Sequence, residues 1–177
     1  MASLPDGTRA VLADGMATVL PLIDAAIYLP PRGALLGLDL GTKTIGVAAS
    51  DPNRRLATIV ETVTRKTFTA DAARLLHLAG ERNIVGWVLG LPINMDGSEG
   101  PRAQSTRAFA GNLGKLTALP IALWDERLST AAVERGLIAA DMKRARRAAV
   151  IDQHAAAYIL QGALDRLARL AQGPRQE

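Results

Sequence analysis

Three acidic residues occur where carboxylates from separate elements are expected to meet. Asp39 ends a short apolar segment at 34–38, Glu126 follows a second one at 119–124, and Asp152 lies near the start of a long amphipathic segment. A carboxylate on a buried strand is costly unless a cation or hydrogen-bond donors satisfy it. Hard divalent cations prefer such oxygen ligands. The three acids therefore predict a site for Mg²⁺ or Mn²⁺, which could support phosphodiester hydrolysis.

Each of these acids also has a structural explanation. Asp39 could pair with Lys43 or cap the turn before Gly41, and Glu126 could be a surface charge. Asp152 could complement the dipole at the start of its helix. The spacing alone does not decide between these alternatives and a metal site.

Basic side chains accompany the predicted acidic site. The candidate phosphate contacts are Lys43, Arg102, Arg107, Arg127, Arg144, Arg146 and Arg147. Residues 143–147 carry four positive charges just before Asp152, which predicts a clamp on a nucleic-acid backbone whose binding falls with salt. The alternative is a solvated charged face, which is the usual role of a charge run.

A polar loop at 93–100 follows the apolar segment 84–89 and precedes Pro101, which is typical of the first turn of a helix. Asn94 and Ser98 in this loop are candidate phosphate ligands, because such a loop before a helix suits an anion. The alternative is an ordinary connection with Ser98 as the helix cap.

Composition narrows the class of protein. The chain has 177 residues, of which 49% are hydrophobic, and 21 Lys and Arg against 17 Asp and Glu give a net charge of +4. A wholly disordered chain is excluded, and the absence of Cys excludes a disulfide scaffold and favours the cytoplasm. No window reaches the roughly 20 apolar residues of a membrane span. The low aromatic content of 3% argues against recognition by base stacking.

The apolar periodicity predicts an α/β fold with a mixed five-stranded sheet and helices on both faces. Three antiparallel strands come first and parallel strands follow. The expected strands are 34–38, 45–49, 56–63, 84–89 and 119–124, and the expected helices are 67–82, one beginning at Pro101, one from Ser129 or Thr130 to 138, and 150–170. Ligands of such sheets bind outside the carboxyl ends of the strands, where the acids and the polar loop fall.

We expect a single catalytic domain at 33–171. Residues 1–32 form an N-terminal extension of undefined role, packed on the domain or loosely tethered to it, with a linker at 30–33. Residues 172–177 form a short flexible tail.

Four segments of this chain resemble the YqgF/RuvX family, whose members are Holliday-junction-resolvase-like proteins described as pre-16S rRNA processing nucleases. They are GLDLGTKTIGVA at 37–48, GLPINMDGSEGPRAQ at 90–104, DERLST at 125–130 and IDQHAA at 151–156. The resemblance runs from about 33 to 170 and implies an RNase H-like fold. It also implies that Asp39, Glu126 and Asp152 are the metal-binding catalytic carboxylates, and that structured nucleic acid, with precursor rRNA favoured and branched DNA possible, is the partner.

Two positions depart from the family pattern. The family carries Lys-Arg where this chain has Lys43-Thr44, which removes one phosphate contact. Related resolvases place a further acid three residues after the helix aspartate, where this chain has Ala155. With fewer ligands the second metal site should be weaker, so the number of ions bound without substrate stays open.

Three other functions remain open at this point. A Holliday-junction-type DNA resolvase would use the same acids, and a binding module of the same fold would lack turnover. The turn at 39–42 also resembles the first phosphate loop of sugar kinase and actin-like ATPases. Those enzymes need a second domain, for which this chain is too short.

Overall fold

The computed structural model describes residues 16–128 and 144–173, with the backbone alone at 144–153. Five strands are formed by the apolar segments: β2 (Leu35–Leu40), β3 (Thr44–Ser50), β4 (Ala57–Thr64), β5 (Gly86–Leu91) and β6 (Ile121–Asp125). β2, β3 and β4 pair antiparallel, and β2, β5 and β6 pair parallel. The predicted mixed sheet with an antiparallel meander is confirmed.

The sheet has six strands rather than the predicted five, in the order β1-β6-β5-β2-β3-β4. β1 (Val19–Pro21) comes from the N-terminal stretch and runs parallel to β6 along its outer edge. The Ile121 N–H donates to the Thr18 carbonyl at 2.9 Å, and the Ala17 N–H donates to the Gly114 carbonyl at 2.9 Å. A three-residue strand that ends at a proline has too little periodicity to be recognised in the sequence.

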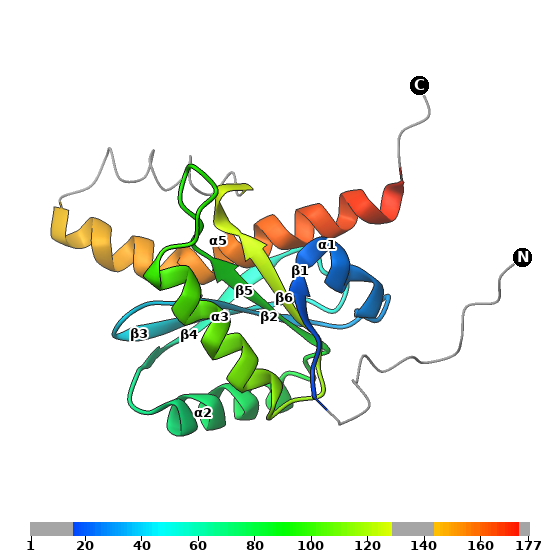
Figure 1. Ribbon diagram of the computed structural model, residues 1–177. Helices are drawn as coiled ribbons and strands as arrows, with labels where there is room; N and C mark the ends of the chain where they lie inside the picture. The colour runs from blue at the N-terminus through cyan, green and yellow to red at the C-terminus, as the bar shows by residue number, and fades with distance from the viewer. Residues whose placement is uncertain (1–15, 129–143, 174–177) are drawn as a thin grey trace, which may run out of the picture.

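Helices cover both faces of the sheet (Figure 1). α5 (Arg144–Gln172) crosses one face, and α2 (Phe68–Glu81) and α3 (Pro101–Gly114) lie on the other. Two short helical turns follow β1, namely α1 (Leu22–Ala25) and η1 (Ala26–Tyr28), and η2 (Glu126–Leu128) follows β6. The helix expected from Ser129 or Thr130 to 138 lies outside the described residues. No helix in the described part of the chain is long and apolar enough to cross a membrane.

Alternation along the strands divides the core into two apolar clusters. Leu36 and Leu38 of β2 pack with Leu75 and Leu113 on the α2/α3 face. Leu35 packs on the α5 face in the cluster that contains Ile159, Leu160 and Val88. Alternate residues of a strand therefore face opposite helix layers.

The helix starts follow their sequence signals. Thr67 caps α2, because its Oγ1 accepts a hydrogen bond from the Ala70 N–H at 3.2 Å. Pro101 occupies the first turn of α3, as predicted. The cap of α3 is Gly100, which makes no side-chain capping bond, so Ser98 is not the cap of this helix.

Candidate functional site

Asp39 occupies the carboxyl end of the central strand. In β2 it alternates with Leu38 and Leu40, which face the α2/α3 layer, so its side chain belongs to the α5 face. Leu38 pairs with Leu89 of β5, and Asp39 and Gly90 are the next residues along their two strands. The carboxylate is half-buried at the sheet edge where the predicted ligand site falls.

Glu126 lies against Gly90 of β5. It is the first residue of η2, directly after β6. A Cβ atom placed on Gly90 would lie 2.6 Å from the Glu126 Oε1 and 2.6 Å from the Ile159 Cδ1 of α5. Real Cβ atoms do not approach other atoms so closely, so the missing side chain at 90 is what makes room for the carboxylate.

The structure thus places Glu126 against Gly90 and Asp39 on the neighbouring strand, one residue beyond the Leu38–Leu89 pair. The third predicted acid, Asp152, is on α5, and its side chain lies outside the described residues. Among the side chains that are described, no three His, Cys, Asp or Glu form a group that could hold a metal ion. Carboxylates on two separate elements at this end of the sheet nonetheless belong to the hard oxygen donors that Mg²⁺ or Mn²⁺ prefers.

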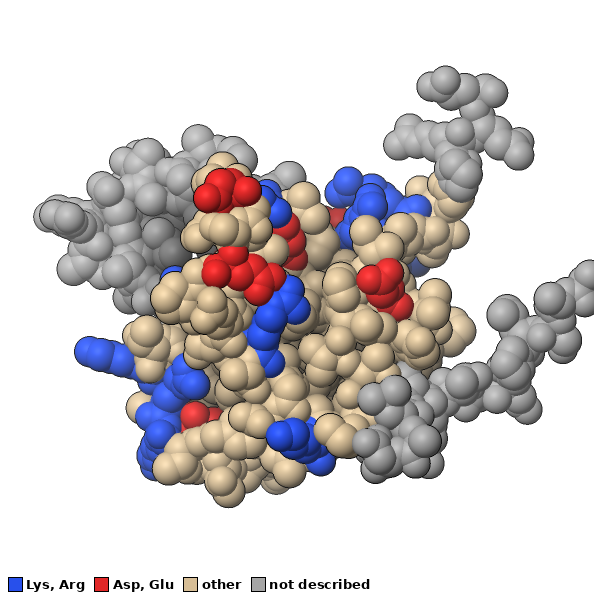
Figure 2. All heavy atoms as spheres, in the orientation of Figure 1, with Lys and Arg blue, Asp and Glu red and all other residues tan. Residues whose placement is uncertain are grey.

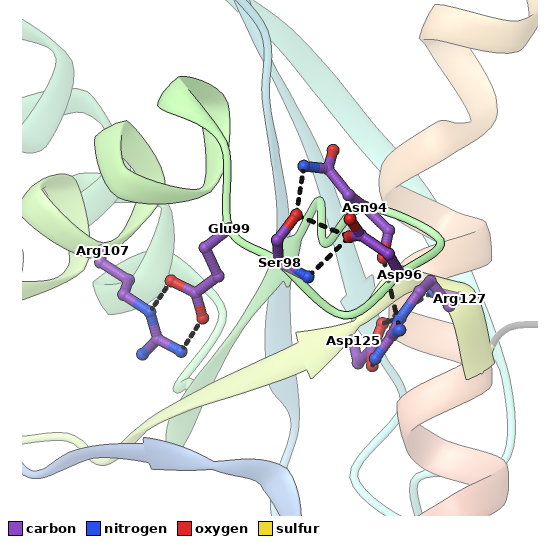
Figure 3. Close-up of polar contacts among 7 residues, drawn as sticks. All are labelled: Asn94, Asp96, Ser98, Glu99, Arg107, Asp125 and Arg127. Carbon is purple, nitrogen blue, oxygen red and sulfur yellow. Dashed lines mark hydrogen bonds and ion pairs between the residues drawn. The ribbon is translucent and has the colours of Figure 1, made fainter.

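The loop between β5 and α3 is closed on itself (Figure 3). Asn94 donates through Nδ2 to the Ser98 Oγ at 3.0 Å, and that hydroxyl donates to the Asp96 Oδ1 at 2.6 Å. The Asn94 N–H donates to the Ser98 carbonyl at 2.9 Å, and Gly97 adopts a φ of 87° that favours glycine. The hydrogen bonds from Ser98 lower the pKa of Asp96. In this structure the polar groups of Asn94 and Ser98 are thus used to hold the loop's own conformation.

Arg127 fastens this loop to the end of β6. Its Nη2 lies 2.7 Å from the Asp125 Oδ2, its Nε lies 3.1 Å from both carboxylate oxygens, and its Nη1 donates to the Asn94 carbonyl at 3.3 Å (Figure 3). The side-chain hydrogen bonds from Arg127 lower the pKa of Asp125, and the same bonds raise the pKa of Arg127. The predicted substrate ligand Arg127 is thus paired with a carboxylate in this structure.

A second arginine in this region is also paired. Arg107 of α3 binds Glu99 through both Nε and Nη2, with 2.6 Å between Nε and Oε2 (Figure 3). These hydrogen bonds lower the pKa of Glu99 and raise that of Arg107. On the face drawn in Figure 2, acidic and basic side chains accordingly lie side by side over the β5–α3 loop.

Two of the other predicted basic residues, Lys43 and Arg102, are exposed near the carboxyl end of β2. Lys43 lies in the β2–β3 turn and Arg102 in the first turn of α3. The side chains of Arg144, Arg146 and Arg147 lie outside the described residues, although the backbone there already belongs to α5.

Two pockets adjoin this end of the sheet. One, of about 170 Å³, is lined by Leu40, Gly41, Thr42, Arg65, Pro101, Arg102, Ser105, Thr106 and Phe109. A larger one, of about 350 Å³, lies between the ends of β1 and β6 and the second half of α5. Neither Asp39 nor Glu126 lines either pocket.

The sequence does not indicate two residues of this region, Arg65 and Gly90, as functional. The Arg65 Nη1 donates to the Gly41 carbonyl at 2.7 Å across a separation of 24 residues, so no local spacing indicates this contact. Gly90 directly follows the apolar segment 84–89 and lies within β5. Its role depends on Glu126, which is distant in the sequence and close only after folding.

The sheet order and the helix layers are those of an RNase H-like fold. A solved structure titled "T. thermophilus RuvC in complex with Holliday junction substrate" is similar, with a TM-score of 0.52 and 13% identity, and the match covers 78% of this chain and 96% of that one. At that identity the likeness shows the fold alone.

Sequence comparison gives the family. The model for "RuvX: Holliday junction resolvase" matches residues 33–166. A protein of Nitrobacter hamburgensis is 78% identical over 154 residues, covering 87% of this chain and 94% of the relative. A protein of Rhodopseudomonas palustris strain TIE-1 is 77% identical over 154 residues, which cover 87% of this chain and 96% of the relative. Both are named "Putative pre-16S rRNA nuclease".

The chain belongs to the RuvX family. Its fold and its family are those of nucleases, which are hydrolases acting on the ester bonds of nucleic acids. The family resemblance and the nuclease class predicted from the four sequence segments are confirmed.

Proposed function

We propose that this protein is a divalent-metal-dependent nuclease that hydrolyses phosphodiester bonds in structured RNA. Its substrate is the precursor of 16S rRNA, which it cleaves at the 5′ end during ribosome biogenesis in the cytoplasm. The single observation that supports the proposal is that Glu126 packs against Gly90 at the carboxyl edge of the sheet, while Asp39 follows the Leu38–Leu89 pair on the neighbouring strand. The names of the relatives support the choice of RNA.

Asp39, Glu126 and Asp152 are the proposed ligands of Mg²⁺ or Mn²⁺. When bound, such ions activate water and stabilise the leaving oxygen. Asp152 belongs to the backbone of α5 and precedes the buried Ala156 by four residues, and the proposal assigns its carboxylate to the same metal site. Ala155 is also buried there, where related resolvases place a further acid.

The proposed substrate contacts surround these acids. Lys43 and Arg102 are exposed beside the end of β2 and contact phosphates directly. Asn94, Ser98 and Arg127 act through the loop that they hold together, whose outer surface meets the substrate. Arg144, Arg146 and Arg147 precede Asp152 on α5 and form the proposed backbone clamp.

A second candidate function is the resolution of branched DNA. The description of the matching family model favours it, because that model is named for a Holliday junction resolvase. A third candidate is a non-catalytic binding module of the same fold, which would bind nucleic acid without cleaving it.

The experiment compares two labelled substrates, a structured RNA carrying the precursor 5′ extension and a four-way DNA junction. Each is incubated with wild type, Asp39→Asn and Asp24→Asn, with Mg²⁺, with Mn²⁺ or with EDTA. Asp24 is an exposed aspartate on α1 and serves as the matched control. We expect metal-dependent cleavage of the RNA by wild type and Asp24→Asn, and its loss in Asp39→Asn. Cleavage of the junction alone would favour the resolvase, and binding without cleavage would favour the module.

A further inference from the structure

The 170 Å³ pocket at the end of β2 has the chemistry of an anion site. It opens on the α3 side of the β2–β3 turn, where Gly41 and Thr42 directly follow the strand that carries Asp39. Arg65 and Arg102 are its charged lining residues, and no Asp or Glu is among the described residues that line it. Thr42, Ser105 and Thr106 add hydroxyl groups.

Arg65 is held in place before any ligand arrives. Its Nη1 donates to the Gly41 carbonyl at 2.7 Å, and its guanidinium carbon lies 5.9 Å from the centre of the Phe109 ring. Its Nε lies 3.8 Å from the Oδ2 of Asp71, a carboxylate that is only 3% exposed and also accepts a hydrogen bond from the Lys66 N–H. A fixed guanidinium loses little conformational entropy on binding an anion.

The position of the pocket relates it to the acids. Leu40 lines the pocket on the α2/α3 face, and Asp39, the preceding residue, belongs to the α5 face. A nucleic-acid strand that crosses the sheet edge at the end of β2 would therefore pass from the carboxylates to the two arginines. We infer that this pocket binds a backbone phosphate of the substrate strand, next to the one that is cleaved, through Arg65 and Arg102.

The inference rests on the proposed function for the identity of the strand but makes a separate prediction about binding. The buried side chains of Leu40 and Phe109 also line the pocket, at 9% and 6% exposure. A lining that combines apolar side chains with two guanidinium groups suits a sugar-phosphate unit better than a free hydrated ion. The pocket therefore contributes affinity for the backbone and no base readout.

The test places a carboxylate in the pocket and measures binding without catalysis. Ser105→Asp adds one negative charge to the lining, and Asn112→Asp adds the same charge to an exposed position on the same helix, away from the pocket. Binding of a labelled RNA hairpin with a single-stranded 5′ extension is measured in EDTA by fluorescence anisotropy. We expect Ser105→Asp to weaken binding about tenfold, because like charges are opposed at close range, and Asn112→Asp by less than about twofold.

Equal effects of the two variants would overturn the inference, since they would reflect net charge alone. Thr42→Asp, on the exposed turn across the pocket, repeats the test on a second wall and should match Ser105→Asp. If Ser105→Asp loses binding, Asn112→Asp keeps it and the wild-type protein does not cleave RNA, the pocket is upheld and the nuclease proposal is rejected. Unchanged binding and cleavage by Ser105→Asp, with an active wild type, would reject the pocket and leave the nuclease proposal standing.

Discussion

The two faces of the sheet differ in the charge that they present at the end of β2. On the α5 face, Glu126 lies over Gly90 and Asp39 follows Leu38 on the adjacent strand, and on the α3 face Arg65 and Arg102 line a pocket. The strand itself separates the two groups, because successive side chains point to opposite faces. Carboxylates for a cation and guanidinium groups for a phosphate are therefore kept adjacent without neutralising each other.

The β5–α3 loop and the end of β6 show the opposite arrangement. There Arg107 binds Glu99 and Arg127 binds Asp125, each through more than one hydrogen bond. A guanidinium held in this way is less available to a phosphate. Counting basic residues near a site is therefore a poor guide to which of them bind a polyanion.

The largest effect should come from filling the space over Gly90. In Gly90→Ala the new Cβ would overlap the Glu126 Oε1 and the Ile159 Cδ1, both 2.6 Å away, so the carboxylate must move. Because a displacement of about 1 Å can cost about 100-fold, we expect cleavage of the labelled RNA to fall by about that factor. Gly111→Ala on α3 is the control, since a Cβ there meets nothing within 4 Å. An active Gly90→Ala variant would show that the position of Glu126 does not matter.

A smaller effect should separate Arg102, which forms no ion pair with the described residues, from the paired Arg107. Arg102→Gln should weaken RNA binding several-fold and reduce the slope of log K against log salt by about 1. Arg107→Gln removes the same charge from the same helix but from an ion pair with Glu99, so its slope should stay close to that of wild type. Both are measured by RNA titration at several salt concentrations. Equal slopes for the two variants would remove the distinction between the two regions.

A paired arginine should become a phosphate contact when its carboxylate is neutralised. Glu99→Gln releases Arg107, and we expect RNA affinity to rise by about twofold at low salt, with a steeper salt dependence. The double variant Glu99→Gln/Arg107→Gln should lose this gain. If the gain persists in the double variant, it comes from the removed negative charge rather than from the freed guanidinium.

Structural features that depend on neighbouring residues could be predicted from the sequence, and features that depend on contacts between distant residues could not. The strands of the predicted sheet follow from continuous apolar segments, and observed boundaries differ by one or two residues because strand ends depend on pairing. The helix at 150–170 was predicted too short, since its basic first turns lack an apolar stripe. β1 depends on its contact with β6, which no local pattern encodes.

The same distinction between local and long-range interactions applies to the candidate site. Asp39 and Glu126 could be proposed as site residues because each stands at the end of a buried strand, at the carboxyl edge where ligands of such sheets bind, whereas the contact of Glu126 with Gly90 appears only after folding. The pairing of Arg127 with Asp125 and the reach of Arg65 to Gly41 depend on side-chain geometry, so an arginine's availability could not be inferred.

The smallest effect concerns a carboxylate that serves only the fold, in the β3–β4 turn. The Asp51 side chain accepts hydrogen bonds from the N–H groups of Asn53, Arg55 and Leu56 at 2.8 to 3.0 Å. These bonds, that of Leu56 first, lower its pKa. Its stabilisation is thus present above the ordinary aspartate pKa and is lost as the pH falls through the lowered value.

We therefore expect Asp51→Asn to lower the Tm at pH 7, with the difference from wild type fading below about pH 4. Thermal unfolding followed by circular dichroism at several pH values measures this, and RNA cleavage at pH 7 should be unchanged. A Tm difference that stays constant down to pH 3 would show that the charge of Asp51 is not what stabilises the turn.

The central claim is that Asp39, Glu126 and Asp152 form one metal-dependent catalytic site. Its most direct test is the initial rate of RNA cleavage as a function of Mg²⁺ concentration, for wild type and for Asp39→Asn, Glu126→Gln and Asp152→Asn. The account predicts a rate that rises with Mg²⁺ in wild type, vanishes in EDTA and falls by about 100-fold or more in each variant. Cleavage at the full rate in EDTA, or a wild-type rate in any of the three variants, would contradict it.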